Sequence, residues 1–211
     1  MKHFDLMPEQ MEKNKNSYNE IANEWNEYRR KTNVEKVVIE FASKIKSRGD
    51  ILDIGCGTGF PIAKYLSDQG FFVTGIDISE NQIQIANDGN INNAQFYVCD
   101  FFDFMPDKKY DGIIAFDSFF YFPREKQKEI YGKVSGWMKA GAYLLFTHGK
   151  TEGETEGEMF GKNFYYSSLE ALDVKKLLLE NNLHVELSME DYKEENVDRD
   201  LIILAQKTRG E

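Results

Sequence analysis

The chain has 211 residues, with 36 acidic and 26 basic side chains, and its formal net charge is −10. Nucleic-acid-binding proteins usually show a basic excess or a basic stripe, so this balance argues against nucleic acid as a partner. No run approaches the roughly 18 apolar residues that a membrane-spanning helix needs. Residues 1–10 also lack the basic flank and apolar stretch of a signal peptide. We therefore expect a soluble, cytoplasmic monomer or homodimer that binds neither nucleic acid nor a membrane.

The length fits one α/β domain, and a hydrophobic content of 41% is enough to fill its core. Cys56 and Cys99 are far apart in the sequence and form no CxxC or His/Cys cluster, so neither a disulfide framework nor a metal site is indicated. Phenylalanines gather at 101–104 and 116–122, and some of these rings are expected to line a ligand pocket.

Two helices are expected before residue 49. Residues 15–31 place apolar side chains at helical spacing and predict one amphipathic helix. Residues 34–45 carry a second and cleaner apolar stripe, which ends near Gly49. We expect residues 1–48 to form a helical cap packed on the same domain, and residues 49–211 to form the main domain.

From residue 50 onward, short β-rich runs alternate with helical segments, which is typical of βαβ units and a largely parallel sheet. The expected strands are 51–54, 71–76, 94–98, 111–116 and 142–147. The expected helices between them are 61–69, a helix capped by Ser79, and 123–138. A capped helix to residue 181 follows, and the adjacent strands 184–189 and 201–205 predict a terminal antiparallel hairpin.

A glycine-rich loop, Asp53-Ile-Gly-Cys-Gly-Thr-Gly59, stands between the first strand and its helix, where an open α/β sheet places its ligand. Glycines there let the backbone approach a ligand and turn into a helix N-terminus, which favours an anionic group. The dinucleotide pattern needs a glycine at position 60, where Phe60 stands, and the lysine of a P-loop is missing. A turn with glycines for packing only is the alternative.

Two further acids follow the next two strands. Asp77 comes 22 residues after Gly55, the spacing at which a carboxylate can accept both hydrogen bonds of a ribose diol. Asp100 stands beside Phe101, where a carboxylate can hold an adenine amino group against an apolar face. Each acid alone is more often a helix cap or a solvated residue. Three acids, including Asp53, at the carboxyl ends of three successive strands indicate a ligand site.

Together, the segments 53–59, 75–79, 99–101 and 110–114 resemble, in order and spacing, the successive motifs of class I S-adenosylmethionine-dependent methyltransferases. The resemblance covers roughly residues 15 to 148. It implies an α/β, Rossmann-like three-layer sandwich with a seven-stranded, mostly parallel sheet of order 3-2-1-4-5-7-6 and an antiparallel last strand. The terminal hairpin agrees with that order independently. S-Adenosyl-L-methionine is the implied cofactor.

The resemblance also implies which residues hold the cofactor. The glycine loop faces the methionine part, Asp77 binds the ribose and Asp100 meets the adenine. Tyr18 and Tyr28 resemble residues that cover the cofactor, although tyrosines on an apolar helix face are as often plain core. The full set of implied cofactor contacts is Tyr18, Tyr28, Asp53, Gly55, Cys56, Gly57, Asp77, Ile78, Asp100, Phe101 and Phe116.

Methyl transfer from a sulfonium is an in-line displacement in which alignment and water exclusion supply most of the acceleration. If a base is needed, the candidates are Asp117 and His148, where the fourth and fifth strands end. His148 titrates near neutrality, but a lone histidine there is more often structural. Asp117 is alternatively a partner of the cofactor's ammonium group. Residues 116–122 are aromatic and lack the Asn/Asp-Pro-Pro-aromatic motif of nucleic-acid base modifiers. With the acidic net charge, this points to a small, partly apolar acceptor.

Two alternatives stay open at this point: a non-catalytic S-adenosylmethionine-binding protein and, less well supported, a nicotinamide-dependent oxidoreductase. The tandem Thr-Glu-Gly-Glu at 151–158 is expected to be a solvated, mobile acidic loop. The aromatic residues 159–166 are expected to fold over the cleft as a lid, with Tyr165 or Tyr166 touching the acceptor. Glu152 and Glu154 would then face the entrance and favour a neutral or cationic acceptor over an anionic one.

Overall fold

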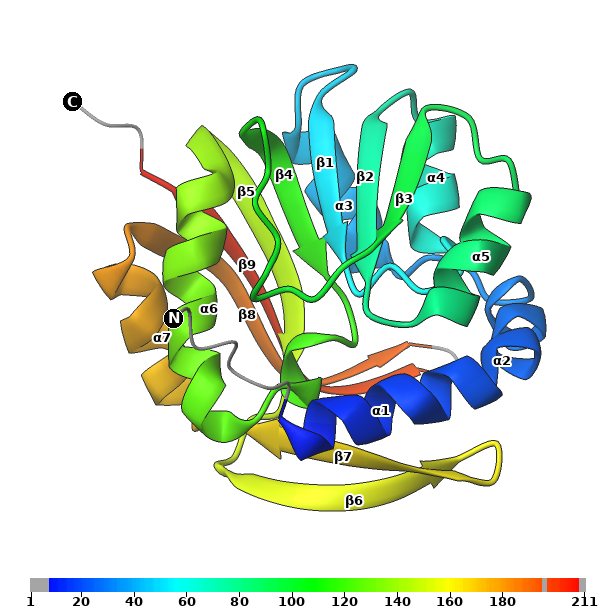
Figure 1. Cartoon of the computed structure of the whole chain (residues 1–211). Coiled ribbons are helices and arrows are strands. Elements are labelled where there is room, and N and C mark those ends of the chain that lie inside the picture. Colours follow the sequence, from blue (N-terminus) through cyan, green and yellow to red (C-terminus); the bar gives the residue numbers. More distant parts are fainter. Residues whose placement is uncertain (1–7, 195–196, 209–211) are drawn as a thin grey trace, which may run out of the picture.

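The computed structural model describes residues 8–194 and 197–208. Its main sheet has seven strands in the order β3-β2-β1-β4-β5-β9-β8 (Figure 1). The strands are β1 Asp50–Ile54, β2 Phe72–Asp77, β3 Ala94–Val98, β4 Tyr110–Ala115, β5 Met138–His148, β8 Leu183–Glu194 and β9 Val197–Lys207. β9 runs antiparallel to both β5 and β8, while β1 to β5 pair in parallel. Counted along the chain within this sheet alone, β8 is its sixth strand and β9 its seventh. The expected order 3-2-1-4-5-7-6 is therefore confirmed.

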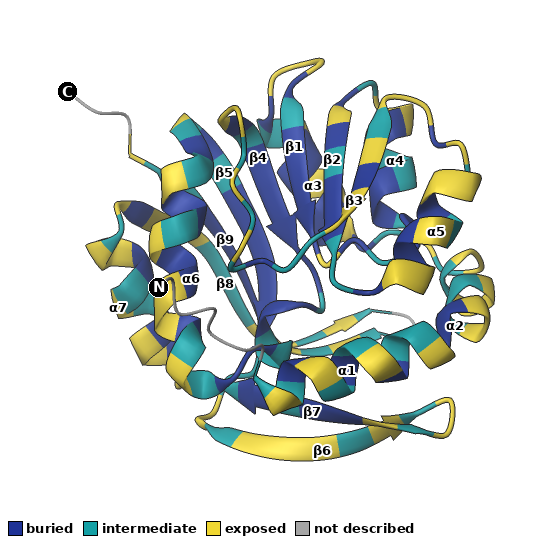
Figure 2. Cartoon of the chain, in the orientation of Figure 1, coloured by how far each residue is buried: buried dark blue, intermediate teal, exposed yellow. Residues whose placement is uncertain are grey.

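Helices cover both faces of the sheet and leave its central strands buried between them, whereas the edge strands β3 and β8 are largely exposed or half-buried (Figure 2). On one face lie α3 Lys36–Lys44, α4 Ile62–Asp68 and α5 Glu80–Asp88, whose apolar residues share a core with β1 and β4. On the other face lie α6 Arg124–Trp137 and α7 Ala171–Glu180 with a second core. A short 3₁₀ turn, η1 Phe119–Tyr121, follows β4. Among the described residues, no helix is long and apolar enough to cross a membrane.

The prediction of a single helix over residues 15–31 is wrong. The chain forms α1 Glu9–Glu20 and α2 Ala22–Arg29, which are separated at Ile21, where φ is −97° and ψ is 8°. The side chain of Ile21 is only 2% exposed. The apolar spacing continues through this break, so periodicity alone did not reveal the change of helix axis. α1 crosses the carboxyl ends of the parallel strands (Figure 1).

Residues 153–159 are a strand and not the expected mobile loop. β6 Gly153–Met159 pairs antiparallel with β7 Lys162–Ser168 to form a separate two-stranded sheet. Phe160 and Gly161 connect the strands with φ values of 51° and 74°, as a two-residue type I′ turn requires. β6 is the mostly exposed strand, whereas β7 buries Phe164 and Tyr165. Glu154, Glu156 and Glu158 of the repeat therefore lie on a solvated strand, and Glu152 precedes it.

The β6–β7 hairpin fixes α1 in place. The buried Asn14 donates to the Tyr165 carbonyl over 2.9 Å and accepts from the Tyr165 amide over 2.8 Å, as a neighbouring strand would. Ser17 donates to the Asn163 carbonyl over 2.7 Å. On the opposite side of α1, Asn19 accepts a hydrogen bond from the Ser79 hydroxyl at the start of α5. α1 is thus held between the hairpin and α5, above the ends of the strands.

Candidate cofactor site

The glycine loop turns sharply after β1. Gly55 and Gly57 have φ values of 72° and 54°, in the region that favours glycine. The amides of Gly55 and Cys56 both donate to the Ile76 carbonyl, over 2.8 and 3.1 Å. A Cβ atom on Gly55 would lie 2.7 Å from the Cβ of Ser118, so no larger residue fits there. The glycines therefore serve a close approach of β1, β2 and the end of β4.

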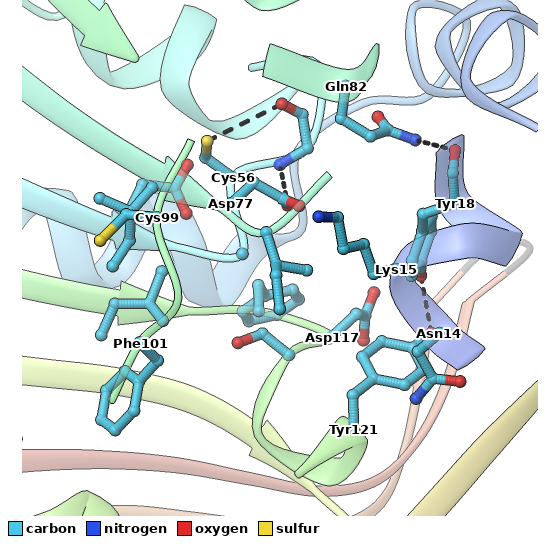
Figure 3. A pocket seen from close by; sticks show the side chains of 18 of the residues that line it. Asn14, Lys15, Tyr18, Cys56, Asp77, Gln82, Cys99, Phe101, Asp117 and Tyr121 are labelled. Carbon is cyan, nitrogen blue, oxygen red and sulfur yellow. Dashed lines mark hydrogen bonds between the residues drawn. The ribbon is translucent and has the colours of Figure 1, made fainter. Parts of the chain in front are cut away.

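A cavity opens over this loop and beneath α1 (Figure 3). Ten of the residues named from the sequence line it: Tyr18, Asp53, Gly55, Cys56, Gly57, Asp77, Ile78, Phe101, Phe116 and Asp117. Most of the remaining lining comes from α1, α2 and the segment after β4. Residues far apart in the sequence thus meet at the carboxyl edge of the sheet, where open α/β folds bind their ligands.

Asp77 is held rigidly at the end of β2. Its Oδ2 accepts a hydrogen bond from the Gly57 amide and its Oδ1 accepts one from the Ser79 amide, both over 2.9 Å. Burial raises the pKa of this carboxyl, and the backbone hydrogen bonds act in the opposite direction. Each carboxylate oxygen keeps a second lone pair for a ligand. Asp77 is thus an oriented acceptor of hydrogen bonds.

Asp53 and Arg29 give the loop end of the cavity one anionic and one cationic group. The Asp53 side chain is 3% exposed, and burial together with the neighbouring Asp77 raises its pKa to about 7. Arg29, on α2, lowers that pKa through its positive charge. Its guanidinium lies 5.4 Å from the centre of the Trp25 ring, and both residues line the cavity.

Asp117 stands where β4 ends, with an uncommon φ of 56° for a residue with a side chain. Its Oδ2 lies 2.9 Å from Nη2 of Arg199, which also donates to Glu35 over 2.7 Å. Its amide donates to the Thr147 hydroxyl over 2.7 Å. This carboxylate is therefore anchored by an ion pair. It also lines a second groove, between β5, the β6–β7 hairpin and β9.

Two tyrosine hydroxyls meet at the same end of the cavity. The Oη atoms of Tyr18 on α1 and Tyr121 in η1 lie 2.7 Å apart. Burial raises the pKa of both phenols, so both stay protonated at neutral pH. The ring of Phe164 lies 4.8 Å from that of Tyr18, and the ring of Tyr166 lies 5.3 Å from that of Tyr121. The aromatic end of the hairpin therefore contacts the residues that cover the cavity.

Three residues named from the sequence do not line this cavity. His148 is 2% exposed and lines the second groove, with Nδ1 2.7 Å from the Gly149 carbonyl and Nε2 3.0 Å from Oε1 of Gln127. Burial lowers its pKa. Asp100 accepts a hydrogen bond from the Phe102 amide over 2.7 Å and fixes the turn that follows β3. Tyr28 is 46% exposed and packs on Trp25, 5.7 Å between ring centres.

Several residues that line the cavity carry no functional signal in the sequence. Trp25 stands at the apolar spacing of the expected helix over residues 15–31, and that spacing does not distinguish a cavity residue from a core residue. Arg29 and Lys15 carry no motif, and only the position of α1 and α2 brings them to the cavity. Gln82 follows Ser79 at the spacing of a capping box, but its side chain donates instead to the Tyr18 carbonyl over 3.4 Å. Ser118 directly follows Asp117. Its position after the fourth strand is the only feature of the sequence that points to the cavity.

Residues 45–199, well over half of the chain, match the family described as "Methyltransferase domain". The chain belongs to this methyltransferase family. The resemblance seen in the motifs, the enzyme class and S-adenosyl-L-methionine as cofactor are thereby confirmed. The nicotinamide oxidoreductase alternative is wrong.

Curated relatives are methyltransferases of different kinds. The methyltransferase is 29% identical over 163 residues to malonyl-[acyl-carrier protein] O-methyltransferase 2 of Ilyobacter polytropus, covering 76% of this chain and 58% of that protein. It is 32% identical over 126 residues to sphingolipid C9-methyltransferase 1 of Gibberella zeae, covering 50% of this chain and 24% of that protein. The chain thus spans between a quarter and about three fifths of the length of these relatives.

Solved structures share the fold of this methyltransferase. Magnesium protoporphyrin IX methyltransferase of Synechocystis with bound S-adenosylmethionine superposes with a TM-score of 0.70 at 16% identity, covering 97% of this chain and all of that one. A methyltransferase of Methanosarcina mazei also gives 0.70, at 21% identity, covering 85% of this chain and 100% of that one. At these identities the likeness concerns the fold.

Proposed function

We propose that this methyltransferase transfers a methyl group from S-adenosyl-L-methionine to a small-molecule acceptor that is neutral or cationic. The observation that carries the proposal is the cavity beneath α1, which joins the glycine loop, the Asp77 carboxylate and an aromatic end at Asp117 and Tyr121. The first three strands of the sheet would hold the donor, and the segment after β4 would hold the acceptor.

The cavity suits the cofactor in the kinds of polar group that it offers. Among the cavity-lining residues that the structure describes, Gln82 Oε1 and Ser118 Oγ are buried atoms without a hydrogen-bond partner, as expected of groups that await a ligand. Asp77 would accept hydrogen bonds from the ribose hydroxyls. Arg29 would pair with the carboxylate of the amino-acid part, and Asp53 with its ammonium.

When bound, S-adenosyl-L-methionine supplies a methyl group on a positively charged sulfur, so the protein's task is chiefly alignment and exclusion of water. Tyr18 and Trp25 would exclude water, because α1 and α2 place them over the loop. Asp117 would accept a hydrogen bond from an N–H or O–H of the acceptor. His148 has no part in this proposal, because it lies outside the cavity and both edges of its ring face neighbouring oxygens.

Charge supports a neutral or cationic acceptor. The second groove adjoins the cavity at Asp117, and its lining includes the carboxylates Asp117, Glu152, Glu154, Asp198 and Asp200 against the cation Arg199. Arg124 pairs with Glu152 over 2.9 Å. After this pairing, the groove still carries more negative than positive side chains. Together with the net charge of −10 on the chain, this negative potential disfavours an anionic acceptor.

A screen for turnover tests the proposal. The purified protein is incubated with S-adenosyl-L-methionine and panels of small amines, neutral hydroxy compounds and carboxylic acids, and release of S-adenosylhomocysteine is measured. We expect turnover with members of the first two panels and loss of that turnover in Asp77→Ala. Turnover confined to carboxylic acids, or to added nucleic acid, would contradict the proposed acceptor class. Cofactor binding without turnover on any panel would favour the non-catalytic alternative.

A further inference from the structure

Three aromatic rings form a continuous wall where the cofactor cavity meets the second groove. Tyr121 lines the cavity, and Phe120 and Tyr166 line the groove. The ring centres lie 4.8 Å apart for Phe120 and Tyr121, 5.3 Å apart for Tyr121 and Tyr166, and 5.9 Å apart for Phe120 and Tyr166. All three residues are only half-buried, so part of each ring is open to a ligand. These three residues are called the aromatic wall below.

The β6–β7 hairpin supplies the third ring of the aromatic wall. Side chains alternate along a strand, so Tyr166 lies on the same face of β7 as Phe164, whose ring contacts those of Tyr18 and Tyr121. A Cβ on Gly157 of the paired strand would lie 3.1 Å from Cε2 of Tyr166, so the glycine leaves the room that this ring uses. The hairpin thus brings Tyr166 to the site from a segment outside the cofactor motifs.

A carboxylate stands beside the aromatic wall. Asp117 lines both the cavity and the groove, and Figure 3 shows it at the same end of the cavity as Tyr121. Burial raises the pKa of Tyr121 and of Tyr166, and the negative charge of Asp117 raises both further. The phenols therefore stay neutral at pH 7, and the negative charge of this region is carried by carboxylates, among them Asp117, Glu154 and Asp200. An open aromatic face near carboxylates attracts a cation.

The protein's own cations leave the aromatic wall free. Among the described residues, no lysine or arginine lies over one of its three rings. Arg199, which pairs with Asp117, lies over the ring of Phe116 instead, 5.4 Å from the ring centre. A cation on the wall would therefore have to come from a ligand.

Ser118 adds a polar group at the same end of the cavity. Its Oγ is buried without a hydrogen-bond partner, 3.0 Å from the position that a Cβ on Gly55 would take. A hydroxyl oxygen can accept a hydrogen bond from an N–H group. Because Ser118 directly follows Asp117, a nitrogen between the glycine loop and the aromatic wall would meet an oxygen acceptor from each residue.

An amine is the acceptor whose charge matches this end of the cavity throughout the reaction. It reaches the site after losing a proton to water, and its lone pair attacks the methyl carbon. A carbon–nitrogen bond forms while the carbon–sulfur bond breaks, and the electrons of the broken bond stay on sulfur. The positive charge thereby passes from sulfur to nitrogen, and the product is a methylated ammonium. A hydroxyl acceptor, in contrast, gives a neutral ether once its proton has left.

We infer that the acceptor is an aliphatic amine, whose nitrogen lies on the aromatic wall beside Asp117 while the rest of the molecule extends along the second groove. This inference rests on the proposed function and narrows its acceptor class. The aromatic wall and Asp117 then hold the ammonium product, and they distinguish an amine from an alcohol of the same shape.

Choline and 3,3-dimethyl-1-butanol test this inference, because the two molecules have the same shape and only choline is charged. Each is titrated calorimetrically into the parent protein saturated with S-adenosylhomocysteine. Choline should bind at least about tenfold more tightly than the alcohol, as expected for a cation on a partly desolvated aromatic face.

Variants of the aromatic wall locate the effect. Tyr166→Leu should weaken choline binding by about tenfold and change binding of the alcohol by less than about twofold. Tyr166→Phe keeps the ring and should bind choline within about twofold of the parent. Tyr97→Leu, at an exposed tyrosine of β3, is the matched control and should bind both molecules like the parent. If Tyr166→Leu does not fold, Phe120→Leu takes its place with the same expected result.

Equal binding of choline and the alcohol, or unchanged choline binding in the leucine variant, would overturn the inference. In the turnover screen, amines should give a kcat/KM at least about tenfold higher than alcohols of the same shape. An equal or higher value for the alcohols would refute the amine and leave methyl transfer itself intact. Failure of the parent protein to bind S-adenosylhomocysteine would instead refute the cofactor site as a whole, and with it this inference.

Discussion

Asp77 is the residue on which cofactor affinity depends most in this account, because two backbone amides orient its carboxylate toward the cavity. Asp77→Ala should reduce the affinity for S-adenosylhomocysteine by about 1.5 to 3 kcal/mol, the range for hydrogen bonds to a charged group. Calorimetric titration measures the loss. Asp88→Ala, on the exposed side of α5, should leave the affinity unchanged. A folded Asp77→Ala protein that binds like the parent would show the assignment to be wrong.

Asp53 is expected to make cofactor binding depend on pH, because burial raises the pKa of this carboxyl. Its pKa of about 7 in the free protein lies above the ordinary value of 3.8, so the carboxyl is largely protonated below pH 7 and charged above it. An ammonium group placed beside it favours the charged form. We therefore expect affinity to rise between pH 6 and pH 8, with release of protons near pH 6.5.

Titrations in buffers of different ionisation enthalpy measure the number of protons released on binding. Asp53→Asn removes the titrating group and should abolish most of this release while weakening affinity above pH 7. Equal proton release in the parent and the variant would contradict the assignment. The same raised pKa means that Asp53 favours the folded state less as pH rises from 4 to 7, because the charged form is the one penalised by burial.

At the scale of residues, the sequence predicted those side chains that follow strands and belong to motifs. Asp53, Gly55, Gly57 and Asp77 line the cavity as expected, because the ends of adjacent parallel strands must meet at one edge of the sheet. His148 also stands at the end of a strand, β5, but side-chain direction and neighbouring contacts decide which cavity it lines. Spacing along the chain carries no information about either.

At the scale of elements, α1 covers the cavity and the β6–β7 hairpin packs on α1, joined to it by Asn14. Asn14→Ala leaves the buried amide and carbonyl of Tyr165 without their partner, and should reduce the free energy of unfolding by about 1 to 3 kcal/mol. Lys13→Ala removes only an exposed ion pair with Glu156 and should cost less than about 1 kcal/mol. Urea unfolding measures both.

Hydrogen exchange provides the check on mechanism, since the Tyr165 amide should exchange faster in Asn14→Ala than in Lys13→Ala. Equal stability of the two variants would contradict this prediction. It would mean that water replaces the Asn14 hydrogen bonds and that Asn14 does not stabilise the packing of α1 on the hairpin.

The hairpin was the element least accessible from the sequence. The Thr-Glu-Gly-Glu repeat alternates like a solvated strand, but its glycines and like charges are equally typical of a loop. The Phe160-Gly161 turn lacks the Asn-Gly or Asp-Gly signal of most two-residue hairpins. What stabilises the strand is β7, whose Phe164 packs on Tyr18 of a helix far away in the sequence. Such long-range packing cannot be obtained from local propensity.

At the scale of the whole molecule, the order of the main sheet was predictable, because alternating strands and helices allow few arrangements of a parallel sheet. The terminal hairpin supplied the antiparallel strand at the correct end. The cover of the cavity was not predictable in the same way, since α1, α2 and the hairpin add no strand to the main sheet and reach the site only through tertiary contacts.

Calorimetric titration of the parent protein with S-adenosylhomocysteine, and separately with NADH, tests the central claim most directly. The loop at Asp53 to Gly59 lets a ligand approach the backbone but lacks the pyrophosphate-binding pattern. We therefore predict saturable binding of one S-adenosylhomocysteine per chain and no measurable heat from NADH. Binding of NADH with no response to S-adenosylhomocysteine would contradict the account.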